Sequence, residues 1–259
     1  MELETIKYSV EGPVAKITLD QPGTDNRVSL KMAQEMHLAC SMVMEDEGVL
    51  VAILTGNGMT FCAGTEEYLE YEQRSSMDIQ QYLRNRRVAS SISDIQKPMI
   101  AAINGDAHGQ GLEIALACDI RITAEHSHLS MPQVKYGAIP WDGGTQRLPR
   151  IIGQSWASDM LITGRTVTAD EAVRIGLVHQ VVSQYRLPTA CSELADTISN
   201  LGPIATRYAK ESVQKGMDMT MDQGMRLEMD LNLIIQTTQD RAEGLSSFLE
   251  KRKPNFRGN

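Results

Sequence analysis

The apolar positions of this chain form two patterns, short continuous runs and longer stretches with helical spacing. The continuous runs have the length of buried strands, and the first two predict a hairpin across Glu11-Gly12. The runs cover residues 5–10, 14–19, 49–54, 99–103, 120–123 and 177–182. Because helical spacing fills most of the intervals between them, the pattern predicts an α/β fold with a mainly parallel sheet.

Helix boundaries are marked by residues that favour helix ends. Ser29 predicts the N-cap of a helix that runs to Asp46, and Thr168 with Glu171 has the spacing of a capping box. Other amphipathic stretches cover residues 79–95, 111–117, 189–199, 203–215 and 220–250, the last with a break near Asp240. Strand signals almost vanish beyond Arg186. We therefore expect a core at residues 1–185 and a C-terminal helical region at 186–259.

Composition narrows the class of protein. The 259 residues are 42% hydrophobic, which is enough for a full core. The net charge of -8 and the lack of a basic stripe argue against a nucleic-acid partner. The four cysteines are widely separated, as in proteins with reduced thiols. No apolar run approaches the ~20 residues of a membrane span, and the N-terminus lacks a signal pattern. We expect a cytoplasmic protein that binds neither nucleic acid nor membrane.

The segment from Asn104 to Glu113 carries the strongest chemical signal. It follows an apolar run, and its glycines Gly109 and Gly111 lie where the next helix begins. The first N–H groups of a helix have no intrahelical partner, and the helix dipole favours negative charge there. A carbonyl oxygen that gains negative charge would be stabilised at this turn, with the carboxyl of Glu113 one turn away.

A second glycine turn lies at Phe61 to Glu66, after the strand predicted at 49–54. Because parallel strands end at the same edge of a sheet, we expect the two turns to meet in one crevice. One N–H group from each turn would form an oxyanion hole. Gly64, Thr65 and Gly109 would then border the substrate, while Glu66 is either a pocket residue or a solvated loop charge.

These motifs resemble those of the crotonase family of enoyl-CoA hydratases and isomerases. The resemblance rests on Phe61-x-Ala-Gly64, Ile103 to Glu113, Cys118-Asp-Ile-Arg121, Pro132 to Leu148, Thr163-Gly-Arg165, Ala169 to Ala172, Gly176-Leu-Val178 and Glu250-Lys-Arg252. It implies a stacked ββα superhelix with a C-terminal helical trimerisation region, assembled as a trimer or a dimer of trimers. It also implies an acyl-CoA substrate, and no separate cofactor because coenzyme A is part of that substrate.

The resemblance also implies roles for single residues. The thioester carbonyl would accept hydrogen bonds from the N–H groups of Ala63 and of Gln110, which replaces the usual glycine, and Glu113 would be the general acid and base. The second glutamate of family hydratases is here Gln133, whose amide carries no proton at neutral pH. Lys251 matches a family lysine that reaches coenzyme A, often across a subunit boundary. Arg27 is a second candidate for phosphate contact.

The missing second carboxylate leaves alternatives open. Our main prediction is a hydratase that uses Glu113 alone, on a dienoyl or cyclic acyl group for which a buried Trp141 would be suited. An isomerase would need only Glu113 as a proton shuttle. Asp142 would either supply the missing group or cap the helix that begins near Gly144. A CoA-ester binding protein without catalysis is disfavoured by the retention of Glu113.

Two other side chains near the turns have simpler interpretations. His108 fits a hydrogen-bonded structural group better than a pocket residue. Cys62 has no identifiable base partner, so we interpret it as a small buried thiol and not as a nucleophile.

Overall fold

The computed structural model describes residues 3–65 and 76–259. Within this part, one sheet has six strands in the order β1-β2-β3-β5-β7-β10. The hairpin of β1 and β2 is antiparallel, and every other neighbouring pair is parallel, which confirms the predicted α/β arrangement. The strands are β1 (Ile6–Glu11), β2 (Val14–Leu19), β3 (Val51–Gly56), β5 (Met99–Ile103), β7 (Ile120–Ala124) and β10 (Gln180–Val182).

A smaller sheet, which the sequence pattern did not reveal, lies beside the first. Its order is β4-β6-β8-β9, and its strands are β4 (Thr60–Cys62), β6 (Asp106–His108), β8 (His128–Ser130) and β9 (Thr166–Thr168). Strands of three residues are too short to show alternation. The predicted turn at Phe61 therefore begins as a strand, and β6 intervenes between β5 and the following helix. Because β4 and β6 are parallel neighbours, the segments that follow them leave the sheet side by side.

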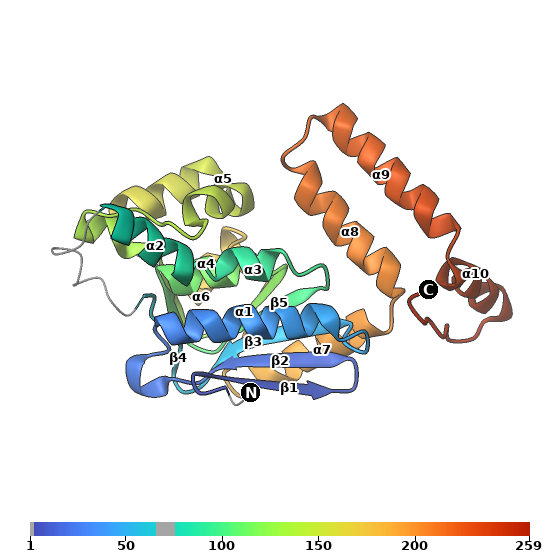
Figure 1. Cartoon of the computed structure of the whole chain (residues 1–259), viewed down its shortest axis with the longest axis horizontal. Coiled ribbons are helices and arrows are strands. Elements are labelled where there is room, and N and C mark those ends of the chain that lie inside the picture. The colour runs from blue at the N-terminus through green and yellow to red at the C-terminus, as the bar shows by residue number, and fades with distance from the viewer. Residues whose placement is uncertain (1–2, 66–75) are drawn as a thin grey trace.

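Both faces of the main sheet are covered (Figure 1). Helices α1 (Leu30–Glu45) and α4 (Gln110–Ala117) contribute to the larger core on one face. Helix α7 (Leu187–Ser199) packs on the other face, where its Leu187 and Cys191 join a second apolar cluster with Ile100. Because α7 belongs to the core, the helical part that stands apart begins later than the predicted boundary at residue 186.

The prediction of one continuous helix at residues 79–95 is wrong. The structure has two helices, α2 (Ser76–Arg86) and α3 (Ala89–Ser93), with two residues between them. The N–H groups of Val88 and Ala89 donate to the carboxylate of Asp142, at 2.8 and 2.9 Å. A contact with a residue so distant in sequence is invisible to a local hydrophobic pattern, yet it fixes the start of α3.

The predicted caps are largely confirmed. Ser29 accepts a hydrogen bond from Met32 at the start of α1. Thr168 caps α6 (Ala169–Arg174) in the same way, but the carboxylate of Glu171 binds Arg165, so the reciprocal half of the capping box is missing. The other long helix of this region is α5 (Gly144–Thr163).

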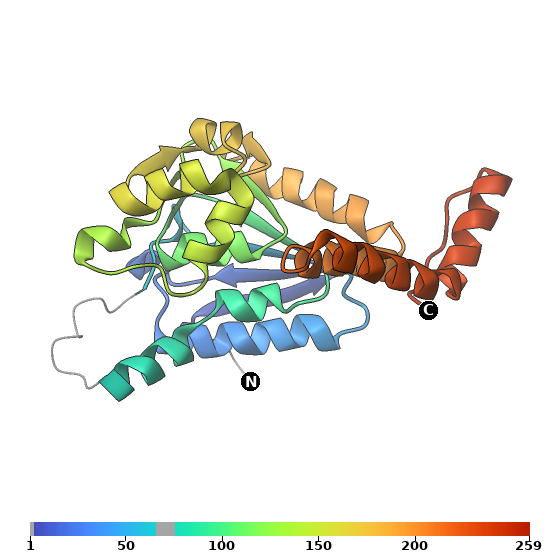
Figure 2. The ribbon, with the colours of Figure 1, turned by 90° about the horizontal axis from the view of Figure 1, so that it is seen from above.

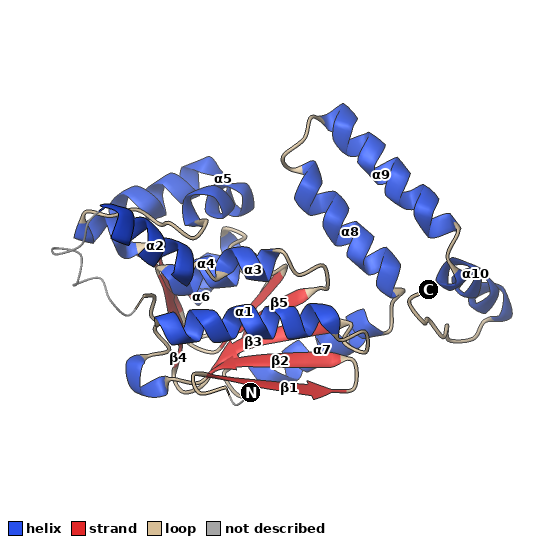
Figure 3. Ribbon diagram, viewed as in Figure 1, coloured by secondary structure: helices blue, strands red, loops and turns tan. Residues whose placement is uncertain are grey.

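The last three helices extend away from the sheets as an arm, which Figures 2 and 3 show from two directions. They are α8 (Pro203–Gly216), α9 (Met221–Gln236) and α10 (Gln239–Glu250), so the break expected near Asp240 is confirmed. The arm exposes Val213, Met217, Met221, Met225, Met229, Leu233, Ile234, Leu245, Phe248 and Leu249. In residues 3–65 and 76–259, no helix is both long enough and apolar enough to cross a bilayer.

Candidate active site

The two glycine turns meet at the edge of the small sheet, as expected from the parallel strands. A Cβ atom placed on Gly64 would lie 3.1 Å from the carbonyl oxygen of His108 and 3.8 Å from the backbone nitrogen of Gln110. Gly109 has φ 54° and ψ -120°, a conformation that disfavours other residues, and it sets the direction of α4. The glycines are thus required by close packing and by backbone geometry.

The prediction that Ala63 is an oxyanion donor is wrong, because the Ala63 N–H already donates to the carbonyl of Asp25 at 2.9 Å. The chain is extended here and pairs with Val28, whose N–H donates to Gly64. Within the described residues, the N–H groups of Thr65 and Gln110 donate to no protein acceptor. Gln110 is the first residue of α4, so its N–H also carries the positive end of the helix dipole.

The side chain of Gln110 is fully buried and occupied by protein contacts. Its amide nitrogen donates to the carbonyl of Arg86 and to Asp142 Oδ2, the latter at 3.1 Å. Its oxygen accepts from the hydroxyl of Thr65 at 2.8 Å. The side chain is therefore turned into the protein, and the replacement of the usual glycine leaves the backbone N–H without a competing partner.

Glu113 lies in the first turn of α4, with its side chain fully buried. Its Oε1 accepts from the N–H groups of Asp142 and Gly144, at 2.7 and 2.8 Å, while its Oε2 has no hydrogen-bond partner in residues 3–65 and 76–259. Burial raises the pKa of Glu113 to about 8, against the opposing effect of the N–H donor of Gly144. Such a carboxyl can both accept and release a proton near neutral pH, which is the property of a general acid and base.

Gln133 lies in a short 3-10 helix (Pro132–Tyr136) that follows β8, the neighbour of β6. Its side chain is buried, yet its amide nitrogen and its amide oxygen both lack hydrogen-bond partners in the part of the chain that the structure describes. Because an unsatisfied buried amide is costly, a ligand that both donates and accepts would be stabilised beside it.

Asp142 does cap a helix, but not the one that was expected. Helix α5 has Gly143 at its N-cap and no side-chain cap. The Asp142 carboxylate instead accepts from the two N–H groups at the start of α3, and its own N–H holds Glu113. Both of these N–H groups and the side-chain amide of Gln110 bind Oδ2, whereas Oδ1 is buried 3.7 Å from Arg87 and has no hydrogen-bond partner among the described residues.

The glycine pair before α5 shapes the wall beside Glu113. Gly143 has φ 106°, and a Cβ on it would lie 2.0 Å from Nη1 of Arg147. A Cβ on Gly144 would lie 3.1 Å from Cγ of Glu113. Both positions therefore allow the loop to approach the carboxyl closely enough to donate its N–H groups.

The remaining candidate residues have mixed outcomes. Trp141 is half-buried and not buried as predicted, and Arg27 is exposed. His108 contacts Ser130 and Asp106, and burial lowers its pKa against the opposing effect of the Asp106 carboxylate. Burial raises the pKa of the Cys62 thiol to about 12, which confirms an unreactive thiol. Glu66 lies outside the described residues.

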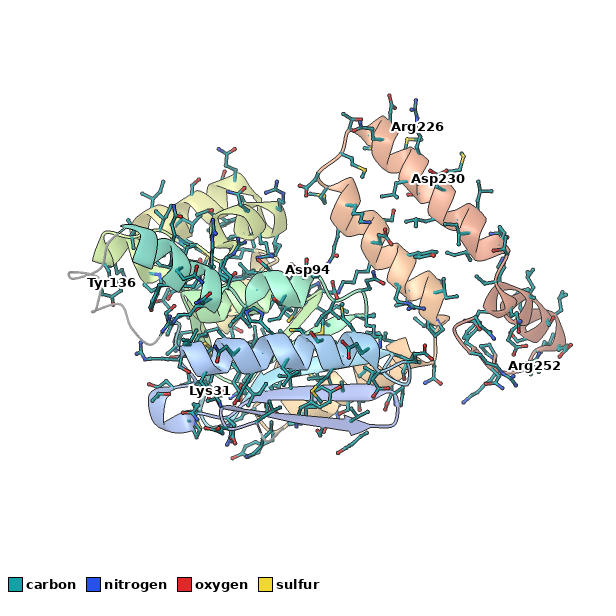
Figure 4. All side chains as sticks on the ribbon, viewed as in Figure 1. Lys31, Asp94, Tyr136, Arg226, Asp230 and Arg252 are labelled. Carbon is teal, nitrogen blue, oxygen red and sulfur yellow. The ribbon has the colours of Figure 1, made fainter. Side chains whose placement is uncertain are left out.

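Lys251 does not join the other candidates within one chain. It is exposed at the end of α10, where it has φ 54°. Its neighbour Arg252 lies at the opposite end of the molecule from Tyr136, which ends the 3-10 helix that carries Gln133 (Figure 4). A contact between Lys251 and a ligand at this site would require a second copy of the chain.

Comparison with known proteins agrees with this geometry. A family model described as enoyl-CoA hydratase/isomerase matches residues 9–259. The chain is 36% identical to the crotonyl-CoA hydratase of Syntrophomonas wolfei, covering 99% of each protein. It is 34% identical to the short-chain-enoyl-CoA hydratase of Clostridium acetobutylicum, covering 98% of this chain and 97% of that one.

The fold agrees as closely as the sequence. The crystal structure of the enoyl-CoA hydratase from Bacillus anthracis superposes with a TM-score of 0.94 at 36% identity, over 99% of this chain and 100% of that one. With a match that spans both sheets, the two glycine turns and the helical arm, the chain belongs to the enoyl-CoA hydratase/isomerase family and has the crotonase fold.

Proposed function

We propose that this protein adds water to the conjugated double bond of an enoyl-CoA thioester with Glu113 as the only proton-transfer group. The observation that carries the proposal is the state of Glu113. One of its oxygens is fixed by two N–H donors, the other is buried and unpaired, and its pKa is raised to about 8 by burial.

The thioester would be polarised by the N–H groups of Thr65 and Gln110. As water attacks the β-carbon, negative charge develops on the thioester oxygen, and two fixed donors stabilise this charge more strongly than they stabilise the substrate. The adjacency of Gly64 to the Gln110 nitrogen supports this pairing, since it brings the two turns together.

The reacting water would lie between Glu113 and Gln133. The unpaired Oε2 of Glu113 would accept its proton, and the amide of Gln133 would orient its oxygen. The hydroxyl then bonds to the β-carbon, and the enolate receives at its α-carbon the proton that Glu113 took. Because Glu113 ends in its starting state, the cycle needs no second carboxylate and no cofactor beyond the coenzyme A of the substrate.

The neutral side chain of Gln133 also favours a second candidate, double-bond isomerisation. In that reaction Glu113 would remove a proton from one carbon and return it to another, with no water consumed. The same oxyanion donors would stabilise the same kind of enolate. Only the fate of oxygen separates the two reactions.

The coenzyme A part would be bound by Arg27 at the mouth and by Lys251 from a second copy. Arg27 is exposed and directly precedes Val28, whose N–H donates to Gly64 of the first glycine turn, and this position supports the first contact. Because the arm extends away from the sheets that carry the site, the contact of Lys251 would have to come from another copy of the chain (Figure 1). Dienoyl and cyclic acyl groups, for which the half-buried Trp141 offers an aromatic wall, are the substrates that we propose to test first.

The decisive experiment incubates the protein with linear, dienoyl and cyclic enoyl-CoA thioesters in ¹⁸O-labelled water. Mass spectrometry of the products should show one labelled oxygen per hydrated molecule. A moved double bond without label would establish isomerisation and reject the main proposal.

Two variants assign the roles of the side chains. Glu113→Gln should lower kcat at least ~100-fold, the usual scale of lost proton transfer. Gln133→Met keeps the size of the side chain but removes both polar atoms, so it should lower kcat without loss of stability. Normal hydration by either variant would reject the role given to that residue.

A further inference from the structure

Asp142 contacts three elements around the site, although the proposed function gives it no proton to transfer. Its Oδ2 accepts from the Val88 and Ala89 N–H groups and from the side-chain amide of Gln110. Its backbone N–H donates to Glu113. One residue therefore contacts the start of α3, the start of α4 and the catalytic carboxyl.

Gln110 extends this connection to the other glycine turn. Its amide nitrogen binds Asp142, and its amide oxygen accepts from the hydroxyl of Thr65. The hydrogen bonds run without interruption from Thr65 through Gln110 and Asp142 to Glu113. All four side chains are buried, so water competes little for these bonds.

We propose that Gln110 and Asp142 form a positioning pair, which holds the two oxyanion donors and the carboxyl of Glu113 in one fixed arrangement. The inference rests on the proposed function, because that function defines which groups must be aligned. It also assigns Asp142 a role other than that of the missing acid or base.

Charge is the second part of the role of Asp142. Arg87 lies 3.7 Å from Asp142 Oδ1, and Arg147 donates to the Asp142 backbone carbonyl. After burial, which is the largest cause, the negative charge of Asp142 raises the pKa of Glu113 and the positive charge of Arg147 lowers it. Removal of the Asp142 charge should therefore make Glu113 a weaker base.

The first test compares Asp142→Asn with Gln110→Met in steady-state hydration. Asn keeps an oxygen for the α3 N–H groups but removes the charge, whereas Met keeps the volume of Gln but breaks the bridge. Each should lower kcat about tenfold, the effect of one lost hydrogen bond, while KM changes less than about twofold. The losses in the double variant should be less than additive, because both substitutions break the same connection.

The pH profile separates positioning from acid–base chemistry. In Asp142→Asn the rising limb of kcat/KM should move to lower pH, whereas Gln110→Met should leave it in place. A kcat for Asp142→Asn as low as that of Glu113→Gln would make Asp142 a catalytic residue and overturn the proposal. Unchanged kcat and an unchanged profile in both variants would overturn it as well.

A direct titration keeps this test independent of the proposed reaction. The protonated-carboxyl infrared band that is lost in Glu113→Gln should titrate at lower pH in Asp142→Asn than in the wild type. If the wild type hydrates nothing but this shift occurs, the proposed function fails and the link between Asp142 and Glu113 stands. An unshifted band in an active enzyme overturns the link.

Asp119→Asn is the matched control. Asp119 also accepts from a backbone N–H group, that of Met99, and binds a cation, Lys210, but it lies beyond the opposite end of α4. Its substitution should lower stability without a shift in the Glu113 titration. If Asp142→Asn does not fold, Gln110→Met and the Asp119→Asn control still decide whether the bridge aligns the site.

Discussion

At the residue scale, Glu113 shows two physical effects in opposition. Hydrogen bonds from two N–H groups at the start of α5 favour the carboxylate, but complete removal from water favours the neutral acid. Burial is the larger effect, and the pKa is raised from 4.5 to about 8. The fixed oxygen sets the geometry, and the unpaired oxygen is left to exchange the proton.

This pKa predicts a specific dependence of stability on pH. Below pH 4.5 Glu113 is protonated in both the folded and the unfolded state, so no free energy of unfolding is lost to its ionisation. Between 4.5 and about 8 only the folded state keeps the proton, so the free energy of unfolding falls as pH rises, by up to about 1.4 kcal/mol per pH unit. In denaturant unfolding between pH 5 and 8, the free energy of unfolding of Glu113→Gln should therefore rise relative to that of the wild type as the pH rises. Parallel curves for the two proteins would contradict the raised pKa.

The residue scale also shows why one oxyanion donor was misassigned from sequence. The motif locates the turn, but it does not say toward which side each N–H group points. Strict alternation would direct the N–H groups of Ala63 and Thr65 to the same side, but Gly64 between them has φ 104°, so the alternation is broken there. The pairing of Ala63 with Asp25 and of Val28 with Gly64 decides this, and both are contacts between distant segments.

At the element scale, the sequence predicted the parts that have a long local pattern. The main strands and α1 were found because continuous runs and a capping serine mark them. The sequence did not predict the three-residue strands β6, β8 and β9 or the break before α3. Strand register and the contact with Asp142 depend on tertiary structure, which a local pattern does not contain. The approach of the two glycine turns was therefore predicted, but the side-chain contacts around them were not.

The contact between β4 and α4 gives a prediction at this scale. A Cβ on Gly111 would lie only 2.1 Å from the carbonyl oxygen of Cys62, so Gly111→Ala must push α4 away from the other turn. We expect the free energy of unfolding to fall by about 2 to 4 kcal/mol. We also expect the proposed enoyl-CoA hydration activity to be lost, because the two oxyanion donors would separate. Denaturant unfolding and the hydration rate would measure both effects.

Gly216→Ala is the control for this experiment. Gly216 is the last residue of α8, and a Cβ there would meet nothing within 4 Å. Its substitution should change stability by less than about 1 kcal/mol, since Ala favours the helix. Equal effects of the two substitutions would show that the contact with Cys62 does not hold the turns together.

At the scale of the whole molecule, the arm is the part that exposes many large apolar side chains. Helix α9 exposes Met225, Met229 and Leu233, which are four residues apart and therefore lie on one face. A monomer rarely exposes so continuous an apolar surface, which supports the proposal that copies of the chain assemble through the arm. In the proposed function Lys251, exposed directly after α10, would then link assembly to coenzyme A binding.

Substitution of both Met225→Glu and Leu233→Glu should dissociate the assembly. Because both side chains are exposed, the fold should be retained, and sedimentation should give a species near the 28.6 kDa of one chain in place of a multiple of it. The KM for the enoyl-CoA should rise, as in Lys251→Ala, since both variants remove the same contact, while kcat at saturation should change less.

Lys31→Glu, a charge change on α1 (Figure 4), should leave the assembly intact. Sedimentation of the wild type as a single chain would reject assembly through the arm. An unchanged KM in the dissociated variant would show that Lys251 does not contact coenzyme A.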